Sequence, residues 1–194
     1  MRRHSPRPRT LTSGLGYTLI ELLIVVALLG LASAMLVPHM VKRDAMACQA
    51  AVRLIIADLS FAQSDAWSHQ EYRRVQFYDD GSGYCIVRVT ESDFSNPFDP
   101  DDADYINDPL ASGGAASPYK VNFTTDQRFE GVSISEVAID GNHKFITFDS
   151  LGGTVSSPGV PGTGGTITVA TDAETYRITI APFTGKLTVE LISP

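Results

Sequence analysis

An unbroken apolar run dominates the start of the chain, from Tyr17 to Val37, reading YTLIELLIVVALLGLASAMLV. As a helix it would be about 31 Å long, close to the thickness of the hydrocarbon core of a bilayer. The pattern therefore predicts a transmembrane helix over residues 17–38. Residues 1–16 form a short leader before it, and residues 39–194 are long enough for one folded domain.

Beyond Pro38 the apolar residues recur every three or four positions, which indicates an amphipathic helix. The members of this stripe are Val41, Ala45, Cys48, Val52, Ile55, Ile56, Leu59, Ala62 and Ala66. We expect the helix to continue to about Ser68 and to pack its apolar face on a sheet.

After His69 the hydrophobic period changes to two, which is typical of strands. The expected strands are Tyr72 to Tyr78, Tyr84 to Val89, Tyr119 to Thr124, Val132 to Ile139, Lys144 to Phe148, Thr166 to Ala170, Thr175 to Ala181 and Lys186 to Leu191. Asp79 to Gly83 reads as the turn of a first hairpin, and Pro182 to Gly185 as the turn of a last one. The fold class is α+β, with a long N-terminal helix on antiparallel β-sheet.

Charge is distributed unevenly along the chain. The net charge is −7, and the leader carries four arginines and no acid, so residues after Gly16 sum to −11. By the positive-inside rule the leader stays in the cytoplasm and residues 39–194 cross the membrane, which in a bacterium places them in the periplasm. Their acidic balance argues against nucleic acid as a partner, because phosphate binding needs clustered Lys and Arg.

Glu21 is the anomalous residue of the apolar run. A carboxylate at this depth costs about 2.5 to 3.5 kcal/mol on insertion scales and usually marks a function. A free α-amino group, created by cutting the chain after Gly16, would be a natural partner for it. An ordinary secretory signal peptide, cleaved after Ala32-Ser33-Ala34, and a plain single-span anchor are alternatives. Both leave Glu21 unexplained.

The stretch Gly16, Tyr17, Thr18, Leu19, Ile20, Glu21 resembles the cleavage and methylation motif of prepilins. This resemblance implies that a prepilin peptidase cuts between Gly16 and Tyr17 and methylates the new N-terminus at Tyr17. It further implies that Glu21 pairs with the N-terminal amine of a neighbouring subunit during assembly. Pro38 also resembles the family, in which a proline at this depth kinks the helix.

The body resembles the type IV pilin-like H-type minor pseudopilins of type II secretion, the GspH/FimT family. The matching stretches are Asp58 to Ser64 with Ala66, Phe148 to Gly152, Ile178 to Ile180 and Thr184 to Leu187. The resemblance implies a minor subunit of the periplasmic pseudopilus that drives protein export across the outer membrane. The alternative it leaves open is a minor pilin of a type IV pilus, FimT/FimU-like, in pilus assembly, adhesion or DNA uptake.

Two loops were considered as binding sites. Asp99, Asp101, Asp102 and Asp104 could hold Ca²⁺, but their spacing is not that of an EF-hand loop, and a solvated acidic loop is the preferred interpretation. The Gly-rich stretch Gly152 to Gly165 lacks the Gly-Lys-Ser/Thr ending of a phosphate loop. It is expected to be a flexible surface loop.

Cys48 and Cys85 could form one disulfide in an oxidising compartment or remain two buried thiols, and sequence leaves both alternatives open. The four histidines lie in unrelated elements, so we expect neither an enzyme nor a cofactor or resident metal. The expected partners are prepilin peptidase, other pilin-like subunits and the bacterial inner membrane, which the chain crosses once. No nucleic acid and no small-molecule substrate are expected.

Overall fold

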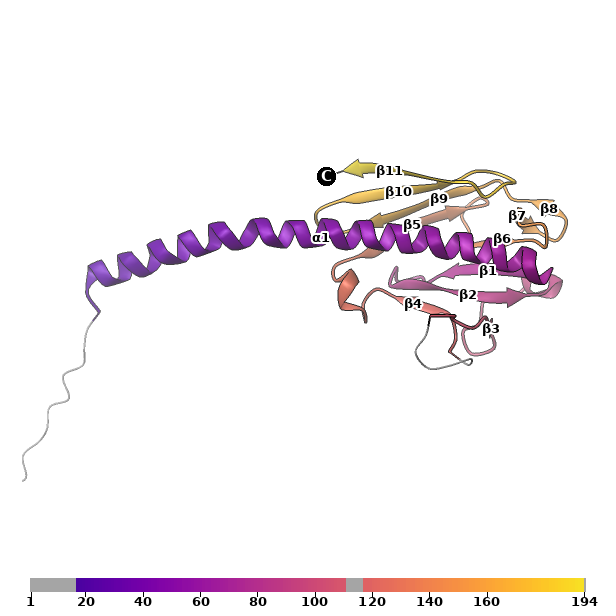
Figure 1. Ribbon diagram of the computed structural model, residues 1–194, viewed down its shortest axis with the longest axis horizontal. Helices are drawn as coiled ribbons and strands as arrows, with labels where there is room; N and C mark the ends of the chain where they lie inside the picture. Colours follow the sequence, from indigo (N-terminus) through magenta and orange to yellow (C-terminus); the bar gives the residue numbers. More distant parts are fainter. Residues whose placement is uncertain (1–16, 111–116, 194) are drawn as a thin grey trace, which may run out of the picture. The chain divides into compact units, whose positions relative to one another are not determined.

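The computed structural model describes residues 17–110 and 117–193, except that side chains at 34–42 are not described. The chain divides into two units, Met1–His39 and Met40–Pro194, and each is considered by itself. Helix α1, Leu19–His69, contributes to both, which confirms the long N-terminal helix (Figure 1).

The C-terminal end of α1 is closed by hydrogen bonds that explain where it stops. Gln70 has a φ of 58°, in the left-handed region, and the Glu71 N–H donates to the Ala66 carbonyl at 3.2 Å. This is the bond of a Schellman cap, here made with glutamine in place of the usual glycine. The Gln70 side chain donates to the carbonyls of Trp67 and Ser150, which ties the cap to a turn of the sheet.

Two antiparallel sheets follow α1. The first has the order β3-β2-β1-β6-β7-β8, with β4 also paired to β2, and the second has the order β11-β10-β9-β5. The first sheet contains β1 Tyr72–Phe77, β2 Gly83–Val89, β3 Asp104–Tyr105, β4 Lys120–Asn122, β6 Phe145–Phe148, β7 Thr154–Ser157 and β8 Val160–Pro161. The second contains β5 Ser133–Ile139, β9 Gly165–Ala170, β10 Thr175–Ile180 and β11 Leu187–Ser193. Short 3-10 helices span Glu91–Phe94 (η1) and Gln127–Phe129 (η2).

Most of the expected strands are confirmed, and one expectation is wrong. The stretch Gly152 to Gly165 is not simply a surface loop, because it contains β7 and β8, which extend the first sheet beyond β6. Its Gly, Pro and Ser content hid two short strands with no alternating pattern. The hairpin of β10 and β11, with its turn at Pro182 to Gly185, is as predicted.

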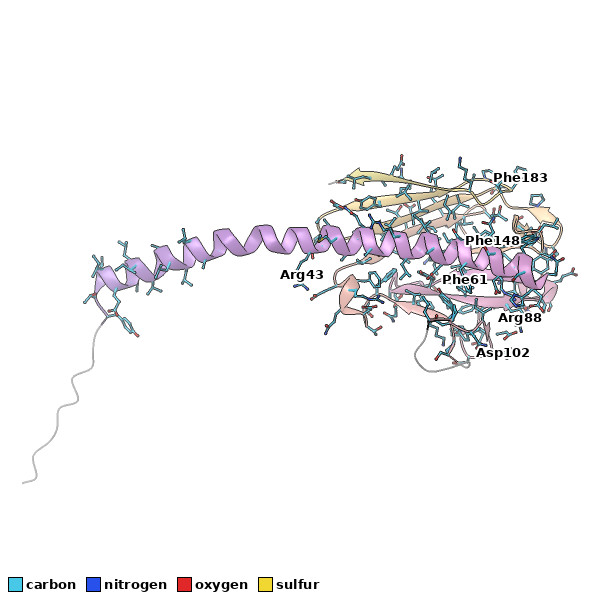
Figure 2. The ribbon with its side chains drawn as sticks, in the orientation of Figure 1. Arg43, Phe61, Arg88, Asp102, Phe148 and Phe183 are labelled. Carbon is cyan, nitrogen blue, oxygen red and sulfur yellow. The ribbon has the colours of Figure 1, made fainter. Side chains whose placement is uncertain are left out.

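One hydrophobic core joins α1 to both sheets. The stripe from Cys48 to Ala66 is buried against residues of β1, β2 and β6 on one side and of β5, β9 and β10 on the other. In Figure 1 this part of the helix runs along the two sheets, and Figure 2 shows Phe61 and Phe148 along the same layer. The Gln63 amide adds two polar links, donating to the carbonyls of Gly152 and Thr184.

A glycine fixes how β4 joins the first sheet. Gly83 lies opposite Asn122 in the β2–β4 ladder, and a Cβ atom at Gly83 would stand 2.0 Å from the Val121 carbonyl oxygen. No side chain can occupy that space, so glycine is required for the close approach of the two backbones.

A smaller apolar cluster lies on the outer face of the first sheet. Cys85, Val87 and Val89 of β2 are buried there. The segment after β2 covers them, with the partly buried side chains of Phe94, Phe98, Ala103 and Tyr105. The first sheet is therefore covered on both faces, by α1 on one and by residues 91–105 on the other.

A buried carboxylate anchors α1 to the first sheet. Asp58, 4% exposed, accepts hydrogen bonds from the Tyr84 hydroxyl at 2.5 Å and from the Tyr119 hydroxyl at 2.8 Å. Burial raises the pKa of Asp58 above its ordinary value, and the two tyrosine hydroxyls oppose that rise. The pKa of both tyrosines is raised, chiefly by burial.

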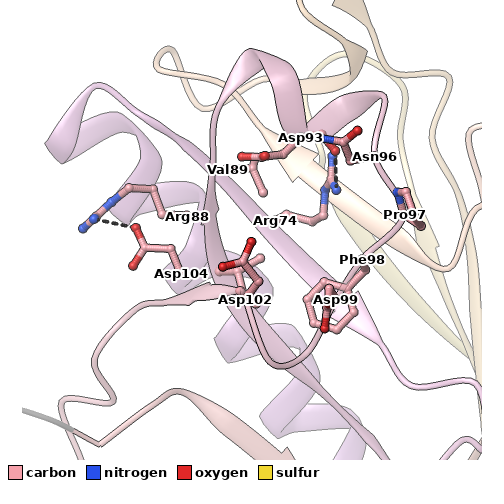
Figure 3. A pocket seen from close by; sticks show the side chains of 12 residues that line it. Arg74, Arg88, Val89, Asp93, Asn96, Pro97, Phe98, Asp99, Asp102 and Asp104 are labelled. Carbon is pink, nitrogen blue, oxygen red and sulfur yellow. Dashed lines mark hydrogen bonds and ion pairs between the residues drawn. The ribbon is translucent and has the colours of Figure 1, made fainter.

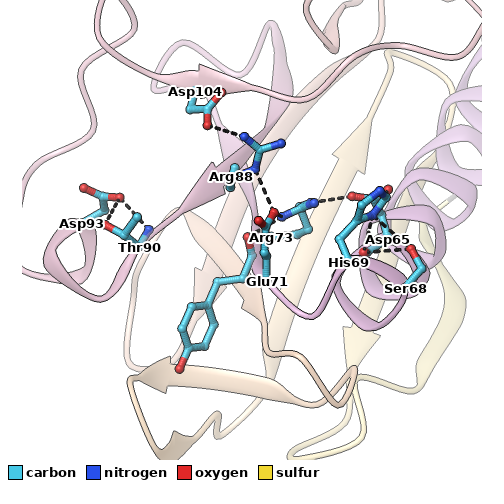
Figure 4. A network of polar contacts seen from close by, with 10 residues as sticks. Asp65, Ser68, His69, Glu71, Arg73, Arg88, Thr90, Asp93 and Asp104 are labelled. Atoms are coloured by element: carbon cyan, nitrogen blue, oxygen red, sulfur yellow. Dashed lines mark hydrogen bonds and ion pairs between the residues drawn. The ribbon is translucent and has the colours of Figure 1, made fainter.

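An ion network secures the junction between α1 and the sheet (Figure 4). The Arg73 side chain, 1% exposed, bridges Asp65 of α1 and Glu71. Arg88 then joins Glu71 at 2.9 Å to Asp104 at 2.8 Å. Hydrogen bonding from Arg73, followed by the charge of Arg88, lowers the pKa of the Glu71 carboxyl. The network connects the end of the helix to β1, β2 and β3.

The network predicts unequal effects for two arginines. Arg73→Ala leaves the partly buried Asp65 with the imidazole of His69, 3.1 Å away, as its one remaining ion-pair partner among the described residues, and we expect it to lower the free energy of unfolding by about 3 kcal/mol. Arg177→Ala removes the exposed pair with Glu190, 3.4 Å apart, and should cost at most about 1 kcal/mol. Urea unfolding of the full chain in detergent, followed by circular dichroism, measures both. Equal losses would contradict the importance assigned to Arg73.

The Asp58 site predicts a pH dependence. Because its folded pKa is raised, its contribution to stability is greatest at low pH, where the carboxyl is protonated. That contribution falls as the pH rises from the ordinary pKa of the unfolded chain through the folded pKa. Asp58→Asn resembles the protonated acid at all pH values. Its free energy of unfolding should therefore rise relative to that of the wild type as the pH increases through this window. Urea titrations of both proteins from about pH 4 to 7 test it. A relative gain of the wild type with rising pH would show that the tyrosines dominate over burial.

Candidate assembly segment

The first turn of α1 is capped by a threonine that precedes it. The Thr18 hydroxyl accepts from the Glu21 N–H at 3.3 Å, and the Thr18 carbonyl accepts from the N–H groups of Glu21 and Leu22. Thr18-x-x-Glu21 is the spacing of a capping box, in which an acid also interacts favourably with the helix N-terminus. Sequence reasoning missed this cap, although the Thr-x-x-Glu spacing was visible. Glu21 is the acidic residue of the first turn of α1, a position where a carboxylate is favourable to the helix N-terminus.

The segment that follows is apolar, and the described part of the chain does not cover it. Every residue from Leu19 to Ser33 is exposed, including large apolar side chains such as Leu19 at 83% and Ile24 at 52%. Figure 2 shows these side chains projecting from the start of α1. Apolar surface of this extent is unfavourable in water, so lipid or other protein chains must cover it.

Among the described residues, one stretch of α1 is long and apolar enough to cross a membrane, Arg43–His69. However, 39% of its most apolar 18-residue window is buried, and the stretch carries the core stripe of the body. Leu19–Ser33 is a shorter apolar helix within the described side chains. Because Arg43–His69 packs on its own sheets, the apolar N-terminal helix is the segment suited to single-pass membrane anchoring.

The remaining residues of the processing motif are only partly described. Gly16 lies outside the described residues, and Tyr17 precedes α1 with 83% of its surface exposed. Pro38 falls within α1, among the residues whose side chains are not described. Cleavage after Gly16, methylation of Tyr17 and a kink at Pro38 stay predictions.

The cysteines occupy different clusters. Both are buried free thiols, Cys48 on the core-facing side of α1 and Cys85 on the outer face of the first sheet. Neighbouring strand residues face opposite ways, and Tyr84 faces α1 through its bond to Asp58, so Cys85 faces away from the helix. The structure thus has the two thiols and not the disulfide. Burial raises the pKa of Cys85 to about 11 and also raises that of Cys48, which makes both poor nucleophiles.

The four aspartates considered for calcium do not form a metal site among the described residues, where no group of three or more His, Cys, Asp or Glu side chains could hold a metal ion. Asp104 pairs with Arg88 at 2.8 Å. Asp99 accepts from the backbone N–H of Asp101 at 2.9 Å. The acidic loop is exposed at all four positions.

The chain has similarities to known proteins in its sequence family and among solved structures. A comparison with curated protein sequences found no significant match. Among solved structures, the chain is similar to the type IV minor pilin FimU of Pseudomonas aeruginosa, with 21% identity, 78% of this chain and 92% of that chain covered, and a TM-score of 0.46. It is also similar to the minor pseudopilin EpsH from the Type 2 Secretion System of Vibrio cholerae, with 13% identity, 76% and 97% covered, and a TM-score of 0.46.

The sequence profile of the family described as Type II transport protein GspH matches residues 51–185. The matched region begins inside α1 and ends at the turn between β10 and β11. Because it covers more than two thirds of the chain, the protein belongs to the GspH family.

Proposed function

We propose that the chain is a minor pseudopilin of a type II secretion system and assembles into the periplasmic pseudopilus that drives protein export across the outer membrane. The observation that carries the proposal is the exposed apolar helix Leu19–Ser33, which bears the carboxylate of Glu21 and continues into a body of the GspH family. Such a helix is suited to moving between two apolar surroundings, the bilayer and a bundle of other subunits' helices.

The proposed sequence of events begins with insertion, the four arginines of the leader holding the N-terminus in the cytoplasm. Prepilin peptidase then cuts between Gly16 and Tyr17 and methylates Tyr17. On leaving the bilayer, the helix packs against the helices of neighbouring subunits. Glu21 selects the register by pairing with a neighbour's N-terminal amine, because an unpaired carboxylate in an apolar bundle is costly. The role is structural, and the chain catalyses no reaction.

Processing gives the first test. Coexpression with an active prepilin peptidase should yield a membrane-extracted chain that begins at methylated Tyr17, measured by intact mass and N-terminal sequencing. Without peptidase the chain should retain Met1. A chain that begins at Met35, or that stays uncut beside an active peptidase, would mean that Glu21 has no new amine to pair with.

Glu21 has two candidate roles, and one substitution separates them. Glutamine serves in a capping box as glutamate does, but it carries no charge. If pairing with an amine drives assembly, Glu21→Gln should reduce crosslinking to other pilin-like subunits about ten-fold, the equivalent of one charged hydrogen bond. Glu136→Gln, which removes one exposed carboxylate from the body, is the matched control. Normal crosslinking of Glu21→Gln would leave Glu21 with its capping role alone.

A gene deletion in the source bacterium tests whether the chain serves a type II secretion system or a type IV pilus. Minor pilins of type IV pili share the same precursor and assembly chemistry, so a phenotype must separate the two. Deletion should abolish export of the type II secretion substrates and leave surface pili intact. Loss of pili with normal secretion would assign the chain to a pilus.

A further inference from the structure

Strand β11 is an edge of the second sheet, and none of the described strands pairs with its outer side. The Lys186 carbonyl accepts from the Ala181 N–H at 2.9 Å, so the backbone of Lys186 is turned toward β10. Because this direction alternates along an antiparallel ladder, the backbone groups of Leu187, Val189 and Leu191 point to the open edge. In Figure 1, β11 lies at the margin of its sheet. The margin therefore offers a row of backbone donors and acceptors.

The same three residues have apolar side chains on the helix-facing side of the sheet. Leu187 and Val189 lie opposite Ile180 and Ile178, which are buried in the core, and residues opposite each other share a face. Val189 is nevertheless 42% exposed and Leu191 is 49% exposed. The apolar face of the second sheet thus extends beyond the part of it that the core covers.

The margin is also open beside the helix. A hollow of about 260 Å³ is lined by Ile56 and Ser60 of α1 and by Lys186 and Leu187, where β11 begins. Water satisfies the backbone groups of an edge strand, but it leaves the apolar side chains beside them exposed. An extended strand provides both kinds of contact, backbone hydrogen bonds along the edge and an apolar side chain at every second position.

The other terminal strands of the two sheets have features that oppose the addition of a strand. β5 has a bulge between Ile134 and Glu136, and β8 has two residues, one of which is Pro161. β3 also has two residues, and its Asp104 carboxylate pairs with Arg88 (Figure 3). Short strands, bulges, prolines and charges are the usual means of protecting a sheet edge.

β11 is not protected in these ways. It has seven residues and no proline, and the register shift in its ladder with β10 lies at its C-terminal end. Its charged residue, Glu190, faces the other side of the sheet from Val189 and pairs with Arg177 at 3.4 Å. An exposed apolar edge of this length promotes aggregation unless another chain covers it.

The direction of the chain restricts which strand can cover β11. A two-fold pairing with β11 of a second copy would turn α1 of the two bodies in opposite directions, whereas subunits inserted in one bilayer share one direction. A neighbour of the same fold and orientation presents the opposite edge of its second sheet, which runs antiparallel to β11 because the strands alternate. In this chain that edge is the bulged β5, so a different subunit with a straight edge strand fits better.

We propose that β11 is the docking edge for a straight edge strand of another pilin-like subunit, which pairs antiparallel with β11 and covers Val189 and Leu191. The inference rests on the proposed assembly with other subunits, and it assigns the surface of the body that one of them contacts. This surface is separate from the N-terminal helix and from Glu21.

Photo-crosslinking of the full chain in the source bacterium tests the proposal. The photoreactive residue p-benzoylphenylalanine replaces Leu191 at the edge, Ile24 in the N-terminal helix or Asp101 in an exposed loop, which reports background. Leu191 should crosslink to a pilin-like subunit, and mass spectrometry should locate the crosslink in an edge strand of that subunit.

The Ile24 position separates this inference from the proposed function. Crosslinks of Ile24 to pilin-like subunits, with none from Leu191 above the Asp101 background, would overturn the docking edge alone. The absence of such crosslinks from both positions would overturn the proposed function as well. Crosslinks of Leu191 to a second copy of this chain, or to a protein that is not pilin-like, would also overturn the docking edge.

A charge at the edge gives a second measurement. In the chain with the photoreactive residue at position 191, Val189→Lys should lower the crosslink yield about ten-fold, because it replaces an apolar contact by a charge. Val160→Lys is the matched control, since Val160 is a similarly exposed valine, 50% exposed, on the short edge strand β8. Circular dichroism checks that both variants are folded. Equal losses in the two variants, or no loss with Val189→Lys, would contradict the docking edge.

Discussion

Burial of the second part of α1 against two sheets is the interaction on which the body depends. Each sheet has an apolar face that must be covered. The stripe from Cys48 to Ala66 packs against both of these faces. Side chains in the stripe are small near the ends and large in the middle, at Ile55 and Leu59, which belong to the same buried cluster as the rings of Phe77 and Phe148. Asp58 lies within the stripe and is tolerated because two tyrosine hydroxyls satisfy it. The result is a helix whose rotation is fixed by packing and by a polar anchor.

The same helix has a first part, Leu19 to Ser33, that no residue in the described part of the chain covers. At about 25 cal/mol per Å² of apolar surface, fifteen exposed residues represent a large favourable term that only lipid or other chains can realise. Both parts of α1 are helical. The second part packs on the sheets of its own chain, whereas the first part needs lipid or other chains to cover it. Thr18 caps the start of this helix, and Glu21 carries the single charge of the segment from Leu19 to Ser33, which is why we propose it as the residue that selects a partner.

The sequence predicted those elements in which apolar residues repeat regularly over a long stretch. A nineteen-residue stripe from Cys48 to Ala66 and the alternation of β10 and β11 are long signals, and both were confirmed. β7 and β8 have four and two residues and sit among Gly, Pro and Ser, so pairing with β6, a tertiary effect, decides them. The fate of the cysteines depends on which face of β2 meets α1, which spacing along the chain does not reveal. The processing motif is read from consecutive residues and stays a prediction, whereas the Asp58 anchor joins α1 to tyrosines from two distant segments of the chain.

Arg73 and Arg74 show how far the environment of a residue outweighs its type. They are adjacent on β1 and point to opposite faces of the sheet, and both are almost fully buried. Arg73 forms ion pairs with the carboxylates of Asp65 and Glu71, so its charge is neutralised within the fold. Arg74 meets aromatic rings, a hydroxyl and a carbonyl, which stabilise a cation less completely than a carboxylate does. A sheet could bury an alkyl chain at this position at lower cost. Of these two adjacent arginines, Arg73 therefore ties α1 to the sheet through its charge, whereas Arg74 contributes mainly contacts with the rings of Phe145 and Phe94 on the outer face.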